Sequence, residues 1–243
     1  SSYSIERQPV GHSAITRANQ ALRDHHHVWE ALGLFHQDLA ARKEILQELT
    51  SATPEGHNRR QALQKAIRHT AHEFHGLGVE INQHYISQGI YLADEPHSYT
   101  PPGRVSENSV LYYEPGTYPW SRLPHVWLKQ ATPTRQVSTI DLAGHGRFTL
   151  FTGIGGDAWK QSAQKVTQKL GVPITVHSLG FRQDWEDVYF EWERVRGVEE
   201  SGAVLVRPDR FIGWRAQEVL PDSRACETKL MVVMRSILGH APV

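Results

Sequence analysis

The 243-residue chain has a single cysteine, no excess of either charge and no long apolar run. With Cys226 alone, neither an internal disulfide framework nor a CxxC redox pair can form. The 26 Lys and Arg residues balance the 26 Asp and Glu residues, whereas a nucleic-acid partner favours a basic surface. No stretch approaches the roughly 18 apolar residues that span a bilayer. We therefore expect a cytoplasmic protein with no nucleic-acid partner and no membrane partner.

The first fifty residues predict two helices. One is expected over residues 9–33, because Pro9 suits a first helical turn and Gly33 suits a C-terminal stop. The other is expected over residues 38–49, where leucine and isoleucine recur at helical spacing. The first hundred residues supply no sheet against which these helices would pack. This indicates a partner domain outside the chain.

A third helix is expected to begin at Thr53-Pro54, where threonine suits the cap and proline the first position. Its apolar residues continue at helical spacing to Tyr85, which makes it the longest periodic segment. Residues 87–119 are then dense in glycine and proline, which marks an irregular linker. Within it, residues 90–92 and 110–113 are candidates for short strands.

We place a domain boundary near residue 105, because strands and helices alternate beyond it. The strand-like segments are rich in β-branched and aromatic residues, and a helical period begins at Ala158 and again near Leu230. Pro208 and Asp209 suit the centre of a type I turn and predict a hairpin. This order predicts a mixed sheet covered by helices. The expected strands lie at residues 137–142, 147–152, 172–179, 201–206 and 211–214.

Two histidine clusters are candidate metal sites. The triplet His25-His-His27 is consecutive, so its side chains point in three directions on a helix, and we interpret it as a solvated face. His69, His72 and His75 lie on one face and make a better metal candidate, with a polar interdomain face as the alternative. The spacing of His72 and His75 differs from the zinc-protease motif, whose histidines are four residues apart. We assign no metal ligand.

A glycine loop from Gly153 to Ala158 joins an expected strand to an expected helix, where free backbone N–H groups favour chemistry. It fits the dinucleotide pattern G-x-G-x-x-G/A. However, the acid expected about 20 residues further on is absent, and Asp157 would repel a pyrophosphate. A thioredoxin-type redox site is excluded because the loop has no cysteine. We favour a structural interpretation, in which glycine turns the chain and Asp157 caps the helix.

Five segments carry recognisable motifs. They are Tyr3-Ser-Ile-Glu-Arg-Gln-Pro-Val-Gly11, Arg122-Leu-Pro-His-Val-Trp-Leu128, Ser138-Thr-Ile-Asp-Leu142, Phe148-Thr-Leu-Phe-Thr-Gly153, and Gly202-Ala-Val-Leu-Val-Arg-Pro-Asp209 followed by Trp214-Arg215. The first resembles the segment that closes the FAD domain of flavin-dependent aromatic hydroxylases, and the other four resemble the C-terminal domain of that family. The branch of phenol hydroxylase and 2,4-dichlorophenol 6-monooxygenase is the most similar. The resemblance covers nearly the whole chain. The four C-terminal motifs, occurring in this order, are specific to the family.

The resemblance implies a parent enzyme that uses FAD and NAD(P)H to hydroxylate a phenol-like ring. It also implies a thioredoxin-like C-terminal domain, without redox cysteines, that contributes to a homodimer. This chain would begin just after the flavin motifs of the family, so we carry over no catalytic and no cofactor-binding residue. Its partners would be the missing FAD and substrate domains. One departure is Arg210, where the family usually has glycine; a positive φ there would cost about 1 kcal/mol.

We therefore expect an α/β chain in two parts. Residues 1–105 would be a helical segment that closes the FAD-binding domain, plus a linker, and residues 106–243 would be a thioredoxin-like domain with a mixed sheet. The chain would act in structure and dimerisation, and it would bind no cofactor and be inactive by itself. Two alternatives stay open: a non-catalytic protein-interaction module, and a standalone nucleotide binder at Gly153–Ala158.

Overall fold

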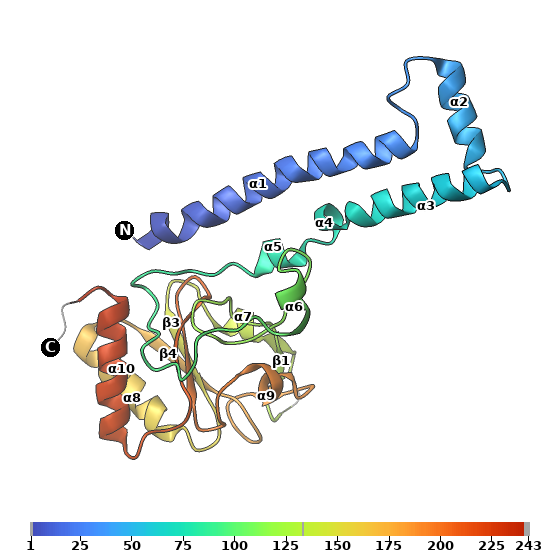
Figure 1. The fold of residues 1–243 in the computed structure, drawn as a ribbon. Helices are drawn as coiled ribbons and strands as arrows, with labels where there is room; N and C mark the ends of the chain where they lie inside the picture. The colour runs from blue at the N-terminus through green and yellow to red at the C-terminus, as the bar shows by residue number, and fades with distance from the viewer. Residues whose placement is uncertain (1, 133, 241–243) are drawn as a thin grey trace. The chain divides into compact units, whose positions relative to one another are not determined.

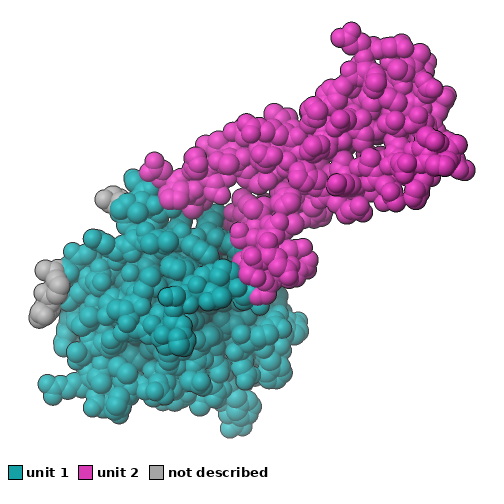
Figure 2. Space-filling view, viewed as in Figure 1, with its two compact units in different colours: residues 1–7, 82–102, 114–243 teal, residues 8–81, 103–113 magenta. Residues whose placement is uncertain are grey.

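The computed structural model describes residues 2–132 and 134–240. The chain divides into two compact units, which Figure 2 shows in different colours. Helices make up unit 2, whereas unit 1 contains all the strands of the described residues. Unit 1 consists of residues 1–7, 82–102 and 114–243, and unit 2 consists of residues 8–81 and 103–113.

The centre of unit 1 is a mixed four-stranded sheet in the order β4-β3-β6-β7. Its first half is a βαβ unit, in which β3 (Phe148–Thr152) and β4 (Ile174–Ser178) run parallel. Parallel neighbours need a crossover, and α8 (Asp157–Leu170) provides it. Gly171 ends α8 in the left-handed conformation, with φ +68°.

The second half of the sheet is the predicted hairpin. β6 (Ala203–Val206) pairs antiparallel with β3 on one side and with β7 (Ile212–Ala216) on the other. α10 (Ser223–Ile237) follows the hairpin and lies beside α8 (Figure 1). A βαβ unit followed by a hairpin and a helix is the thioredoxin-like arrangement. The predicted α/β class, with a mixed sheet after N-terminal helices, is confirmed.

The central strands are buried on both faces. On β3, Leu150 lies in the apolar cluster formed with α8 and α10, while its neighbour Phe151 lies in a second cluster. On β6, Leu205 and Val204 divide in the same way. Successive side chains of a strand point to opposite faces, so β6 reads as a continuous apolar run, while β3 also buries Thr149 and Thr152. The sheet therefore sits between two apolar layers.

A smaller antiparallel sheet, in the order β2-β1-β5, contributes to the second layer. Leu128 of β1 lies in the same cluster as Phe151, together with Trp192 from the short helix α9 (Glu191–Val195). All three side chains are at most 5% exposed. The strands of this sheet are β1 (Trp127–Lys129), β2 (Val137–Ser138) and β5 (Glu186–Asp187).

The strand predicted over residues 137–142 was wrong beyond its first two residues. Thr139–Leu142 forms the helical turn α7, because Ser138 and Asp141 make a capping box. Thr139 stabilises the turn further: its hydroxyl donates to the carbonyl of Pro124 at 2.6 Å and accepts from the N–H of Val126 at 3.1 Å. The β-branched composition that indicated a strand is overridden by these local hydrogen bonds.

The predicted N-terminal helices are present, with one changed start. α1 (Ser2–Ala31) begins seven residues before the predicted start, so Pro9 lies inside it. A tertiary ion pair of Glu6 explains the earlier start, since it holds the first turns in place. α2 (Leu39–Glu48) and the start of α3 (Pro54–His69), with Thr53 as its cap, are as predicted. No described helix is both long and apolar enough to cross a bilayer.

The long third helix predicted as far as Tyr85 was wrong. α3 ends at His69, and the chain continues as two short helices, α4 (Ala71–Phe74) and α5 (Leu77–Ile81). The breaks fall at Thr70 and at His75-Gly76, where α3 and α4 end. Gly78 lies inside α5, where a Cβ would be 2.0 Å from the carbonyl oxygen of Ser109, so this close backbone approach needs glycine. The short strands suggested at residues 90–92 and 110–113 are also absent, because the structure describes both segments and neither forms a strand. A short helix, α6 (Gly103–Glu107), lies between them in the chain.

Candidate functional site

The hairpin of unit 1 carries a cationic side chain that binds the start of the chain. Arg207, which follows β6, donates two hydrogen bonds to the carboxylate of Glu6, at 2.5 Å and 2.8 Å. Ser87 donates a third hydrogen bond to Glu6 at 2.5 Å. Glu6 is only 4% exposed. A bidentate arginine–carboxylate pair of this kind is among the stronger and more specific polar contacts in proteins.

The second strand of the hairpin repeats this arrangement with the linker. Arg215 donates two hydrogen bonds to the carboxylate of Glu95, at 2.8 Å and 2.7 Å. The indole of the buried Trp214 donates to Asp94 at 2.8 Å, and Lys229 of α10 donates to the same carboxylate at 2.7 Å. We call these contacts the hairpin anchor, formed by Arg207, Trp214 and Arg215 with Glu6, Asp94 and Glu95.

The electrostatics of the hairpin anchor favour the charged form of Glu6. Burial alone would raise the pKa of Glu6, but the hydrogen bonds from Arg207 and Ser87, with the charge of Arg207, outweigh it and lower the pKa. The anchor ties residues 1–7 and 82–102 to the hairpin within unit 1. It holds chain segments together and contains no nucleophile activated by a base. Sequence reasoning missed it because its partners lie 201 and 120 residues apart.

Arg210 occupies a left-handed position in the hairpin turn. Its φ is +68°, as the departure from glycine suggested. In this turn, the N–H of Arg210 donates a hydrogen bond to the carbonyl of Arg207 at 3.0 Å. The pairing of β6 with β7 also shifts register beside the turn. Together these features are the pattern of a type I turn with a bulge. The guanidinium of Arg210 donates to the carbonyl of Ala143 at 3.1 Å, and this contact offsets part of the backbone strain.

The glycine loop is packed closely against its neighbours. A Cβ on Gly153 would lie 2.4 Å from the carbonyl oxygen of Glu200, and Gly155 has φ +84°. The cavity beneath the loop holds about 10 Å³, which is room for about one water molecule. These features agree with the structural interpretation and give no support to a nucleotide site at Gly153–Ala158.

The predicted cap of the helix after this loop was wrong. Gly156 is the N-cap residue and makes no side-chain cap, while Asp157 is the first helical residue. Its carboxylate lies 3.9 Å from Lys160, one turn along the helix. Asp157 still stabilises the helix through its charge, because an acid in the first turn complements the helix dipole.

The single cysteine lies far from this loop, inside the core. Cys226 of α10 is fully buried in the cluster that contains Leu230 and Trp159. Burial raises the pKa of its thiol, so the neutral, unreactive form is favoured. The exclusion of a dithiol redox site from the composition therefore agrees with the structural setting of the cysteine.

The trio that sequence reasoning preferred as a metal candidate does not form a cluster in the described residues. His69 binds the carboxylate of Asp24 at 3.1 Å, and His72 binds the side chain of Asn108 at 2.9 Å. Asp24 is buried, and it also accepts from Arg17 at 2.6 Å. Burial would raise the pKa of Asp24, but hydrogen bonds from Gln20, Arg17 and His69 lower it to about 2.

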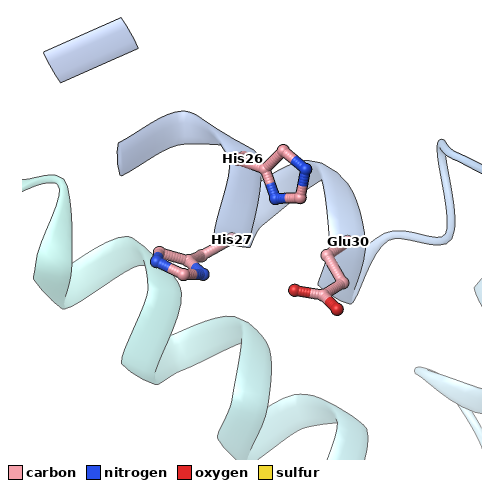
Figure 3. Close-up of side chains that lie close together, drawn as sticks. All are labelled: His26, His27 and Glu30. Carbon is pink, nitrogen blue, oxygen red and sulfur yellow. The ribbon is translucent and has the colours of Figure 1, made fainter. Parts of the chain in front are cut away.

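The consecutive triplet His25–His27 lies beside this trio, and its members have different partners. His26 and His27 lie together with Glu30, near the end of α1, with one possible ligand atom from each within 4.8 Å of the others (Figure 3). His25 turns away and lies 3.3 Å from Glu73 of α4. The three rings of the triplet do not converge on one point, but ligand atoms of His26 and His27 lie near each other and near Glu30.

Comparison with protein families matches residues 117–241 to a family described as the aromatic-ring hydroxylase C-terminal domain. The chain is 37% identical over 235 residues to a phenol 2-monooxygenase of Pseudomonas sp. (strain EST1001), covering 96% of the chain and 37% of the relative. It is 40% identical over 215 residues to a 2,4-dichlorophenol 6-monooxygenase of Delftia acidovorans, covering 88% and 36%. The chain thus spans little more than a third of these curated relatives.

A solved structure extends the likeness to the fold. The flavin-dependent monooxygenase PieE, determined in complex with FAD and substrate, matches with a TM-score of 0.85 and 34% identity. The match covers 99% of this chain and 40% of PieE. The rebeccamycin biosynthetic enzyme RebC, with reduced flavin, matches at 22% identity with a TM-score of 0.62, which supports the fold alone.

Proposed function

We propose, from the premise that this chain belongs to the aromatic-ring hydroxylase C-terminal family, that it is the C-terminal part of an FAD- and NAD(P)H-dependent monooxygenase acting on a phenol-like ring. The observation that carries the proposal is the likeness to phenol monooxygenases over nearly the whole chain but only about a third of theirs. The missing length would hold the flavin and substrate domains. This chain would act in structure and in dimerisation.

The two parts of the chain would have different neighbours in the whole enzyme. Residues 1–105 would close the FAD-binding domain and include a linker. Residues 106–243 would form a thioredoxin-like domain without redox cysteines. The hairpin anchor would connect these two parts, because it joins the β6–β7 hairpin to residues 1–7 and 82–102.

FAD and NAD(P)H would bind to the missing domains. Bound FAD, reduced by NAD(P)H, would supply the activation of O₂, so that one oxygen atom enters the aromatic ring and the other leaves as water. Sequence reasoning assigned no catalytic and no cofactor-binding residue to this chain, and we propose that none is present. Its contribution would be to tie residues 1–7 to the β6–β7 hairpin.

The exposure of apolar side chains supports missing partner domains. Among the described residues, 14 of the 20 exposed large hydrophobic side chains precede residue 93, whereas only 5 of the 31 buried hydrophobic residues do. Exposed apolar surface on this scale marks an interaction site. Trp29, Ile67 and Phe74 belong to this set. We propose that the helices before residue 93 are covered by the FAD and substrate domains.

We propose further that the whole enzyme is a cytoplasmic homodimer and that its substrate is phenolic.

The test is to recover the protein from its source cell with antibodies raised against this chain, and to determine its intact mass, N-terminal sequence and absorbance. The proposal expects a polypeptide of about the relatives' length that carries bound flavin and oxidises NAD(P)H when a phenol is added, with hydroxylated product. The isolated 243-residue chain should stay colourless after incubation with FAD. A recovered protein that ends at these residues and has no flavin and no flavin-bearing partner would overturn the proposal.

A further inference from the structure

The end of α1 brings three possible metal ligands to one side of the helix. Consecutive helical residues differ by about 100° around the axis, which separates His26 from His27. A residue four positions after His26 returns to about 40° from it, so Glu30 stands between the two histidines, one turn further on. Figure 3 shows the two rings and the carboxylate around a common space. The triplet His25–His27 by itself does not indicate this arrangement, because the third ligand, Glu30, lies outside the triplet.

The three side chains are exposed and able to adjust. One ligand atom from each lies within 4.8 Å of the others. In a tetrahedral zinc site with bonds of about 2.1 Å, the ligand atoms are roughly 3.4 Å apart, so side-chain rotation must close a little over 1 Å. No hydrogen bond or ion pair of the described residues occupies the carboxylate of Glu30 or the ring nitrogens of His26 and His27. The carboxylate would therefore lose no protein partner on binding a metal.

Neighbouring rings hold the two imidazoles on this side. The ring of His26 stacks on Phe35, with centroids 4.3 Å apart and an interplanar angle of 28°. The ring of His27 meets the edge of His69, with centroids 5.5 Å apart. His27, Glu30 and His69 line one groove of about 610 Å³. All of these residues belong to unit 2, so the arrangement depends on one compact unit.

We propose that His26, His27 and Glu30 bind a divalent transition-metal ion, with Zn²⁺ as the representative. Two imidazoles and one carboxylate suit zinc, nickel or copper, whereas magnesium and calcium prefer oxygen ligands only. Three protein ligands leave a fourth position for water, which faces the solvent or the groove. The site lies on the helical unit and is separate from the flavin chemistry proposed for the missing domains. Binding would clip the last turns of α1 together before the chain enters the loop to α2.

The test uses the full 243-residue chain without a histidine tag, because a tag would compete for the metal. Zn²⁺ binding is measured by calorimetry and by competition with a chromogenic chelator, and Co²⁺ is added separately to record its visible absorption. We expect one saturable site in the micromolar range. Loss of a side chain that only hydrogen-bonds to a metal ligand lowers metal affinity by about 10–100-fold. Loss of a ligand itself should cost at least as much, so H26Q, H27Q and E30Q should each weaken Zn²⁺ binding by at least about tenfold.

Matched controls separate this site from the other histidines of the chain. H12Q changes an exposed histidine on the same helix, and E44Q changes an exposed acid on α2; both should leave the affinity within about twofold. Circular dichroism of each variant checks that the helices remain. Three results would overturn the proposal. The first is absence of saturable binding in the wild-type chain, and the second is binding that is equally strong in the H26Q/H27Q double variant. The third is an equal loss in H12Q, because it would indicate diffuse binding by many histidines.

Discussion

Arg207 donates two hydrogen bonds to the carboxylate of Glu6, which precedes it in the chain by 201 residues. Each residue lies in one of the motifs that carried the family resemblance, the first in Gly202–Asp209 and the second in Tyr3–Gly11. The ion pair gives a physical reason for these two motifs to occur together. Both side chains are largely buried, so each needs the other to compensate its charge.

The first prediction concerns this pair. Glu6→Gln leaves the buried guanidinium of Arg207 with only the more exposed carboxylate of Asp209, and removing one partner of a buried ion pair typically costs 3–5 kcal/mol. We expect the free energy of unfolding of unit 1 to fall by about 3 kcal/mol, measured by urea titration of tryptophan fluorescence. Glu191→Gln removes an acid from an exposed pair with Arg194, and it should cost at most about 0.5 kcal/mol. Equal effects of the two substitutions would contradict the role of the hairpin anchor.

The second prediction is a pH dependence in unit 2. The pKa of Asp24 is lowered from 3.8 to about 2 in the folded chain, so the unfolded state binds more protons between these values. The stabilisation is therefore complete above about pH 4 and is lost as the pH falls towards 2. At neutral pH, Asp24→Asn should lower the free energy of unfolding by roughly 2 kcal/mol, and this difference should shrink over that pH window.

The measurement for Asp24 combines a carboxyl ¹³C NMR titration with urea unfolding followed by helical circular dichroism. Glu44→Gln, an exposed change on α2, serves as the control and should show no such pH-dependent difference. An Asp24 carboxyl that titrates near pH 4 in the folded chain would show that its hydrogen bonds with Arg17, Gln20 and His69 only offset burial and give no net stabilisation of the charged form.

The third prediction separates backbone strain from side-chain bonding at Arg210. Arg210→Ala and Arg210→Gly both remove the hydrogen bond to Ala143, but only glycine adopts a φ of +68° without penalty. The glycine variant should be more stable than the alanine variant by about 1 kcal/mol. Urea midpoints of the two variants measure this difference. Identical midpoints would mean that the turn relaxes to another conformation when the arginine is removed.

The fourth prediction compares the two halves of the chain by hydrogen exchange. α2 and α3 expose Leu39, Leu46 and Ile67, whereas β3 and β6 are buried on both faces. Segments with few buried apolar contacts open more easily, so amides before residue 88 should exchange faster than those of the β6–β7 hairpin. Sedimentation must first establish that the sample is monomeric. Uniform protection in a proven monomer would show that the N-terminal half is stable without partner domains.

Local signals in the sequence predicted many of the element ends correctly. Thr53 caps α3, Gly239 follows α10 with φ +74°, and the hairpin turns at Pro208 and Asp209. These features depend on hydrogen bonds and backbone preferences within a few residues, which a sequence displays directly. The apolar runs of β3 and β6 were equally readable, because β-branched and aromatic residues favour strands.

Several places where the prediction failed depend on residues distant in the chain or outside the motif considered, whereas the helical turn α7 arises from the local capping box of Ser138 and Asp141. α1 starts early where Glu6 meets Arg207, and Gly78 of α5 packs against the backbone of Ser109. The sequence by itself therefore determined most of the element types, the absence of a dithiol site and the family resemblance. Only the tertiary structure decided which acids compensate the hairpin's arginines and that His26, His27 and Glu30 share one side of α1. The reason is that local preferences act over a few residues, whereas burying a charge requires a partner that only folding brings within reach.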